Sequence, residues 1–262
     1  MKANDPLFQT DGKKQDVNVK KVMFDERVAL SYDEDVGSMY RPEVLDPAVD
    51  FLEAIVGDGA ALEFGIGTGR IALPLSARGV PIHGIDISQP MLKQLQSKPG
   101  SEQIGVTIGD FAETRIHGTF RLVYLVFNTI MNLTTQDEQV ACFENAAAHL
   151  EPGGCFVIEV GVPDLRRLPP GERVHAFNIG QSRFGFDEYT DFTSQIVYSH
   201  HYWTDSGNLR SFSAPFRFVW PSELDLMARI ANMTLHERWA GWRREPFTDE
   251  SSSHVSVWKK PG

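Results

Sequence analysis

A chain of 262 residues, 42% of them hydrophobic, is long enough to bury one large core with a smaller layer attached to it. Its formal net charge of −10 disfavours a nucleic-acid backbone as a ligand, because proteins that bind one concentrate Lys and Arg. The sequence has no apolar run of about eighteen residues and no recognisable targeting pattern at its start, which argues against membrane insertion. We therefore expect a cytoplasmic monomer or homodimer whose partners are small molecules, with no nucleic acid and no membrane.

The two cysteines, Cys142 and Cys155, have neither the spacing of a zinc site nor that of a disulfide framework. One lies in a helical pattern and the other in a strand pattern. We expect two buried thiols and no metal site.

The first part of the chain alternates strand-like and helical segments, an order typical of a parallel sheet with helices on both faces. Apolar runs predict five strands, at residues 61–65, 80–85, 104–108, 122–127 and 155–160. The clearest helix is predicted at 136–150, where Val140, Phe143 and Ala147 recur at helical spacing. Pro74 lacks the N–H that would bond back one turn, so a kink is expected in the helix that follows the first strand.

The second part of the chain has a different order of predicted elements. Residues 173–220 contain successive strand-like runs separated by short polar turns, which predicts an antiparallel meander. Twelve of these residues are Phe, Tyr or Trp. A helix at 221–232 and strands at 234–242 and 254–258 then resume the α/β order. The meander is therefore interpreted as an insertion in a single domain that covers residues 1–262.

Residues 61–70, ALEFGIGTGR, join the first strand to a helix through Gly65, Gly67 and Gly69. Glycines at this spacing let the backbone turn sharply and approach a ligand that side chains would block. A dinucleotide-binding fingerprint, G-x-G-x-x-G, would need its third glycine at position 70, where this chain has Arg70. The motif therefore favours a nucleoside pocket over a nicotinamide dinucleotide site.

Asp86 ends the second strand, where a carboxylate lies beside a ribose in a doubly wound fold. Together with the glycine turn and Glu63, it resembles the cofactor motifs of class I S-adenosylmethionine-dependent methyltransferases, and the order of elements resembles that family over residues 61–150. The resemblance implies a doubly wound, seven-stranded Rossmann-like sheet with S-adenosylmethionine as cofactor. Glu63 would lie near its amino group, and Asp86 would accept hydrogen bonds from both ribose hydroxyls.

The resemblance implies further contacts with the cofactor. Asp110 and Phe111, which follow the third strand, would flank the adenine. Ile87 and Met91 begin the next helical segment after the second strand, and Phe127 ends the fourth strand. A Met at helical spacing is also a common core residue, so Met91 has a second interpretation.

Within that family, the chain looks most like the N,N-dimethyltransferases of nucleotide-linked amino sugars, which also carry an antiparallel insertion after strand five. Their N-terminal segment covers the cofactor with an L-Y-D stretch, and residues 1–50 here contain S-Y-D around Tyr32. The resemblance implies that Tyr32 closes over the methionine end and that Arg41 pairs with the methionine carboxylate. The aromatic insertion 173–220 would form a wall of the acceptor site.

The catalytic residues are expected after strands four and five. The amino-sugar enzymes carry a histidine at the position of Asn132, which holds a hydroxyl or amine by hydrogen bonds but cannot exchange protons near neutrality. Glu159 is the second candidate, either as an acid that points into the cleft or as a strand-end acid bonded to nearby backbone. Methyl transfer from a sulfonium depends mainly on positioning. His200 and His201 are adjacent in a strand, so at most one of them faces a pocket.

Two alternatives stay open at this point. An NAD-linked oxidoreductase would need the dinucleotide fingerprint that Arg70 interrupts. A non-catalytic binding module would keep the fold, and Asn132 in place of a histidine favours it. The preferred hypothesis is a methyltransferase that acts on a small molecule, an amino sugar or another natural-product intermediate, with transfer to nitrogen, oxygen or carbon left open.

Overall fold

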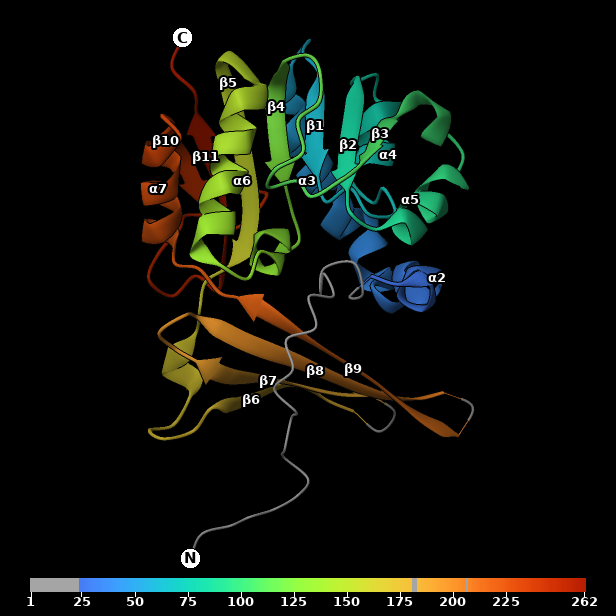
Figure 1. The fold of residues 1–262 in the computed structure, drawn as a ribbon, viewed down its shortest axis with the longest axis vertical. Helices are drawn as coiled ribbons and strands as arrows, with labels where there is room; N and C mark the ends of the chain where they lie inside the picture. Colours follow the sequence, from blue (N-terminus) through green and yellow to red (C-terminus); the bar gives the residue numbers. More distant parts are fainter. Residues whose placement is uncertain (1–23, 181–182, 206) are drawn as a thin grey trace, which may run out of the picture.

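The computed structural model describes residues 24–180, 183–205 and 207–262, and in these residues two sheets form (Figure 1). The larger sheet has seven strands and forms the core. Its strands lie side by side in the order β10 (Thr234–Trp239), β11 (Ser253–Lys259), β5 (Leu150–Gly161), β4 (Phe120–Leu125), β1 (Ala61–Phe64), β2 (Ile82–Asp86) and β3 (Gly105–Ile108).

The first five strands of the chain are parallel, whereas β11 runs antiparallel between β5 and β10. The predicted doubly wound, Rossmann-like sheet is therefore confirmed. Several boundaries differ from the prediction: β5 begins at Leu150 rather than at residue 155, and β2 begins at Ile82 rather than at residue 80. Strand β4 begins and ends two residues earlier than expected, because the chain turns at Val126, and β10 ends at Trp239 rather than at residue 242.

Helices cover both faces of the core sheet, apart from the first, which lies beyond the carboxyl ends of the strands (Figure 1). They are α2 (Glu26–Asp35), α3 (Pro42–Val56), α4 (Ala72–Ala77), α5 (Gln89–Gln96), α6 (Gln136–His149) and α7 (Pro221–Ile230), with short 3-10 turns η2 (Gly37–Tyr40), η3 (Ser101–Gln103), η4 (Thr129–Asn132) and η5 (Leu165–Arg167). Successive strand residues point to opposite faces, so Val123 packs with α6 and α7, and Leu122 packs with α3 and α4. Both faces are apolar, as expected for a parallel sheet.

The expected kink at Pro74 is wrong. Helix α4 begins at Ala72, so Pro74 lies in the first helical turn, where a backbone N–H has no partner within the helix. Helix α6 ends at His149, one residue before the predicted end, because Leu150 already begins β5.

The second sheet is the predicted antiparallel insertion. Its strands are, in order, β6 (Val174–Ile179), β7 (Arg183–Asp191), β8 (Ile196–Asp205) and β9 (Asn208–Arg217), and we call it sheet B. Sheet B lies across the end of the core at which the parallel strands terminate (Figure 1). Arg217, only 3% exposed, anchors it by bonds to Gln139 on α6 and Glu223 on α7.

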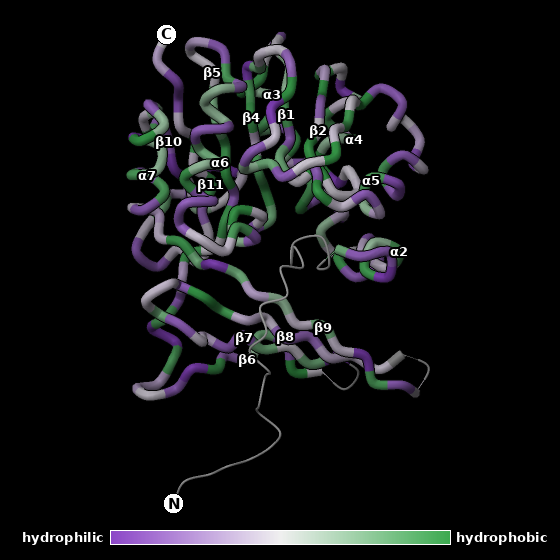
Figure 2. Tube along the Cα trace, viewed as in Figure 1, coloured by the Kyte–Doolittle hydropathy of each residue, from purple (hydrophilic) through white to green (hydrophobic). Residues whose placement is uncertain are grey.

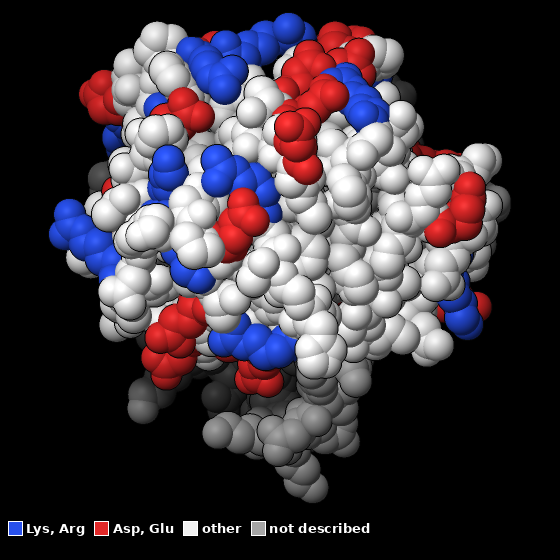
Figure 3. All heavy atoms as spheres, turned by 90° about the horizontal axis from the view of Figure 1, so that it is seen from above, with Lys and Arg blue, Asp and Glu red and all other residues white. Residues whose placement is uncertain are grey.

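The distribution of hydrophobic residues differs between the core and sheet B. Hydrophobic residues concentrate in the middle of the core, whereas the strands of sheet B carry both hydrophobic and hydrophilic residues (Figure 2). On the end of the core opposite sheet B, acidic and basic side chains are interspersed (Figure 3). Among the described helices, none combines the length and apolarity that a membrane crossing requires.

Candidate functional site

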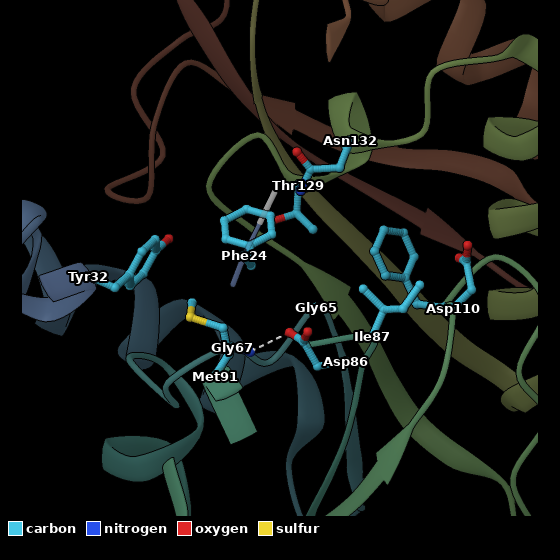
Figure 4. A pocket seen from close by; sticks show the side chains of 11 residues that line it. Phe24, Tyr32, Gly65, Gly67, Asp86, Ile87, Met91, Asp110, Thr129 and Asn132 are labelled. Carbon is cyan, nitrogen blue, oxygen red and sulfur yellow. Dashed lines mark hydrogen bonds between the residues drawn. The ribbon is translucent and has the colours of Figure 1, made fainter. Parts of the chain in front are cut away.

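The turns that follow β1, β2, β3 and β4 meet at one edge of the core sheet and enclose a hollow of about 580 Å³ with helix α2 (Figure 4). This volume includes the opening of the hollow to solvent. Residues from five separate segments line it, namely Phe24, Tyr32, Gly65, Gly67, Asp86, Ile87, Met91, Asp110, Phe111, Thr129 and Asn132. Most of the predicted site residues therefore come together, although they are up to one hundred residues apart in sequence.

The glycine turn after β1 forms the floor of this pocket. Gly65 has φ +68°, and a Cβ there would lie 2.6 Å from Cγ2 of Thr129, so no larger residue fits. Gly67 lies beside the pocket-lining Met91. Gly69 does not line the pocket, because its missing side chain makes room for Leu95 of α5, and its role is in packing.

Asp86 connects the first two turns of the edge. Its Oδ2 accepts the N–H of Gly67 at 2.7 Å, drawn as a dashed line in Figure 4, and its Oδ1 accepts the N–H of Ser88 at 2.8 Å. Burial raises the pKa of Asp86 above its ordinary value, and these backbone donors oppose the rise. A carboxylate oxygen accepts more than one hydrogen bond, so this orientation leaves capacity for ligand hydroxyls.

Glu63 lies inside β1 and is only 3% exposed. Tyr124 donates its hydroxyl to Oε2 of Glu63 at 2.8 Å. Burial raises the pKa of Glu63 to about 8, and the bond from Tyr124 and the charge of Arg70 limit the rise. The predicted contact of Glu63 with an amino group stays a prediction.

Helix α2 is held against the glycine turn by a cluster around Asp33. Its Oδ1 accepts the hydroxyls of Tyr40 and Thr68, both at 2.6 Å, and its Oδ2 pairs with Lys98 at 2.5 Å. Burial raises the pKa of Asp33, but the bonds from Lys98, Thr68 and Tyr40 outweigh burial and keep the pKa below its usual value. This latch holds Tyr32 at the pocket, where burial raises the tyrosine pKa to about 12.

The predicted role of Arg41 is not supported by its position. Arg41 is exposed at the start of α3 and does not line the pocket. Arg70 is closer to the site, with its guanidinium 5.0 Å from the centre of the Phe127 ring and its charge acting on Tyr32 and Glu63. From the sequence, Arg70 served only as an argument against a dinucleotide site, because a residue that follows a glycine turn gives no indication of where its side chain points.

The turn after β4 is strained and is fixed by Glu159. Phe127 and Asn128 both have positive φ, 59° and 61°, which is unusual for an aromatic residue. Glu159 accepts the N–H of Phe127 on Oε2 and the indole N–H of Trp242 on Oε1, both at 2.9 Å. These contacts favour the interpretation of Glu159 as a strand-end acid, and they hold the turn that carries Asn132 to the pocket wall.

The remaining wall is apolar. Phe111 stacks on Phe64 with ring centres 5.8 Å apart, and Asp110 accepts the N–H of Ala112 at 2.9 Å. Tyr32 and Asp110 lie at opposite ends of the pocket (Figure 4). The described residues contain no group of three or more His, Cys, Asp or Glu side chains arranged for a metal ion.

Comparison with known proteins identifies the family. The model of a methyltransferase domain matches residues 61–154. The structure of the CcbJ methyltransferase from Streptomyces caelestis is 33% identical and covers 92% of this chain and 98% of its own, with a TM-score of 0.81. The chain belongs to the class I S-adenosylmethionine-dependent methyltransferases. The predicted family and cofactor are confirmed.

Two further relatives are more distant. The putative methyltransferase YqeM from Bacillus subtilis is 31% identical over 104 residues, and the matched region covers 39% of this chain and 42% of YqeM. The amino pentose methyltransferase CalS10 from Micromonospora echinaspora, solved with S-adenosylmethionine bound, is 22% identical over 89% of this chain and 96% of its own, with a TM-score of 0.67. CalS10 is similar in fold.

If the contacts of Asp33 hold helix α2 over the pocket, weakening them should shorten the time for which the cofactor stays bound. We expect Asp33→Asn to speed the dissociation of S-adenosylhomocysteine by roughly threefold to tenfold, a modest factor because partly exposed ion pairs are screened. Stopped-flow fluorescence measures the rate. Glu34→Gln, an exposed neighbour on the same helix, is the control and should leave the rate unchanged. Equal rates for wild type and Asp33→Asn would show that the latch does not retain the cofactor.

The raised pKa of Glu63 predicts that the free energy of unfolding depends on pH. Its folded-state pKa of about 8 lies above the ordinary value of 4.5, so its contribution to stability is complete at low pH and is lost as the pH rises through 8. The free energy of unfolding of the wild type should therefore fall relative to that of Glu63→Gln between about pH 5 and pH 8. Urea unfolding at several pH values measures both. A difference that is independent of pH would contradict the assigned shift.

Glu159→Gln should lower the free energy of unfolding by about 1–3 kcal/mol, because an amide keeps only one acceptor for two fixed N–H donors. Turnover should also fall by about tenfold to a hundredfold, since the displaced turn moves Asn132. Urea unfolding and single-turnover kinetics measure the two effects. Glu102→Gln, on an exposed turn, should change neither. A Glu159→Gln variant of wild-type stability would show that the two bonds do not fix the turn.

Proposed function

We propose that this methyltransferase transfers the methyl group of S-adenosylmethionine to an amine nitrogen of a small molecule, with amino sugars as the favoured class. The observation that carries the proposal is Asp86, which two backbone N–H groups orient beside the glycine turn. A nucleoside cofactor fits there, because its ribose hydroxyls need a buried acceptor of fixed direction. Two structural neighbours, an amino pentose methyltransferase and a sugar N-methyltransferase, support the acceptor class.

Each end of the pocket suits one part of the cofactor. The apolar wall of Ile87 and Phe111, with Asp110 beside it, suits an adenine with its exocyclic amine. Tyr32 and Arg70 suit the methionine end, where the guanidinium would bind the carboxylate in place of Arg41. When bound, S-adenosylmethionine supplies a methyl group on a positively charged sulfur that is already a good leaving group.

The protein's own contribution is placement. Thr129 and Asn132 line the pocket on the side of the β4 turn, and we assign to the Asn132 amide the orientation of the acceptor by hydrogen bonds. Sheet B lies over this edge of the core and would exclude water from the reacting atoms. The described residues of 173–220 then form the acceptor wall, and residues 24–50 form the cover of the cofactor, while residues 1–23 of the predicted covering segment lie outside the described residues.

The competing functions are less well supported. A dinucleotide oxidoreductase is disfavoured by Arg70 at the third glycine position and by the family match. A binding module without turnover remains the second candidate, because Asn132 stands where the amino-sugar enzymes carry a histidine. Cytoplasmic location and a monomeric or homodimeric state remain predictions.

Calorimetry and transfer assays test the proposal together. The wild type should bind S-adenosylmethionine and S-adenosylhomocysteine but not NAD, and Asp86→Ala should weaken binding at least tenfold, because a charged hydrogen bond contributes about 1.5–3 kcal/mol. Asp86→Asn controls for the loss of packing. Labelled S-adenosylmethionine with a panel of amino sugars, phenols and keto acids then identifies the acceptor. Absence of cofactor binding, or equal affinity for NAD, would overturn the proposal.

A further inference from the structure

Sheet B presents two chemically different faces, and the strand registers determine which residues share a face. Asp187 pairs with Ser199, and Gly185 pairs with His201, so Asp187, Ser199 and His201 point the same way. Arg183, two residues before Gly185, shares that face and forms an ion pair with Asp35 at the end of helix α2. This face is therefore turned toward α2, the helix that holds Tyr32 at the pocket.

The opposite face meets solvent. His200 bonds Ser213 at 2.8 Å and Glu188 at 3.3 Å and stacks on Phe186 with ring centres 4.7 Å apart. Tyr198 on the same face is 37% exposed. Of the two adjacent histidines, only His201 is directed toward the core.

The core-facing side holds a connected polar cluster. The hydroxyl oxygen of Ser199 lies 3.2 Å from Nε2 of His201, and the same hydroxyl forms a hydrogen bond with Asp187. His175 lies opposite Asp187 on the neighbouring strand. All four side chains are half-buried. When the Ser199 hydroxyl donates to Asp187, it accepts the N–H of His201 Nε2, and Nδ1 of His201 is then the acceptor nitrogen.

Aromatic rings flank this cluster. Phe177 and Phe212 lie on either side of His201, with ring centres 5.1 and 6.1 Å from it. Phe177 is 45% exposed, so its ring has free surface for a ligand. A carboxylate beside aromatic rings attracts a cationic amine by charge and by cation–π contact.

We propose that Asp187, Ser199 and His201 form the binding and proton-accepting site for a basic acceptor amine, an inference that rests on the proposed methyl transfer. The bound cationic amine first passes one N–H proton to Nδ1 of His201, and the freed lone pair then forms the new N–CH₃ bond as the C–S bond breaks with its electron pair on sulfur, which becomes neutral. The methylated nitrogen leaves with one positive charge, and His201 then gives its proton to water. Asp187 stabilises the resulting imidazolium through Ser199.

Neighbouring charges are consistent with this role. Burial lowers the pKa of His201, with Asp187 and Asp35 opposing that shift and Arg183 and His200 adding to it, so the imidazole is neutral and ready to accept a proton. Burial raises the pKa of Asp187. The base that Asn132 lacks is thus supplied by sheet B.

The chain offers a matched pair of variants, because His201→Gln and His200→Gln alter adjacent residues on opposite faces of one strand. The probe is D-glucosamine, added to the complex with S-adenosylhomocysteine and followed by NMR of ¹³C-labelled histidines. We expect D-glucosamine to shift the His201 signal and leave the His200 signal unmoved, and N-acetyl-D-glucosamine, which has no basic amine, to shift neither. Asp187→Asn should reduce the amine affinity by about tenfold.

Kinetics give a second readout with the amine that is turned over fastest in the acceptor panel. His201→Gln should lower kcat by about a hundredfold with KM within threefold and remove the acidic limb of the pH profile, whereas His200→Gln should match the wild type. S-adenosylhomocysteine affinity, unchanged in every variant, shows that the fold persists.

Three results would overturn the inference: equal effects of the two histidine variants, an unmoved His201 signal, or transfer to phenols alone. With cofactor binding intact, the first two leave the methyltransferase proposal standing. Failure of the wild type to bind S-adenosylhomocysteine would instead remove the proposed function itself.

Discussion

The hydrogen bond from Gly67 to Asp86 is the contact on which the site depends. Parallel strands place their carboxyl ends at one edge, and this 2.7 Å bond joins the turn after β1 to the acid that ends β2. It fixes the carboxylate of Asp86 in a buried position, and it requires a glycine turn that brings an N–H close to the acid. The remaining pocket walls are arranged around this junction.

Buried or half-buried acids recur near this edge, each with donors of its own. Glu63 is bonded by Tyr124, Asp86 by backbone N–H groups, and Glu159 by a backbone N–H and the indole of Trp242. A carboxylate in a low-dielectric site is costly unless it is bonded in this way. These donors therefore hold each acid in one orientation.

Sheet B, on which we propose the acceptor site, is also fixed in place by specific polar contacts. Its attachment through Arg217 and its ion pair from Arg183 to Asp35 connect it to both sides of the cleft. The acceptor site that we propose on sheet B is therefore built from other residues than the cofactor site. Fold similarity alone therefore identifies the cofactor of such a protein sooner than it identifies the acceptor.

The sequence by itself determined the parallel sheet, the glycine turn, the place of Asp86 and the antiparallel insertion, because hydrophobic periodicity and glycine spacing are local properties. Tertiary structure alone decided that Glu159 bonds Trp242, that Arg70 rather than Arg41 lies near the pocket, and that Lys98 reaches Asp33. These contacts join residues far apart in the chain, so no local pattern encodes them. Alternation along a strand required that His200 and His201 face opposite ways, but only the packing of sheet B against α2 decided which of them faces the core.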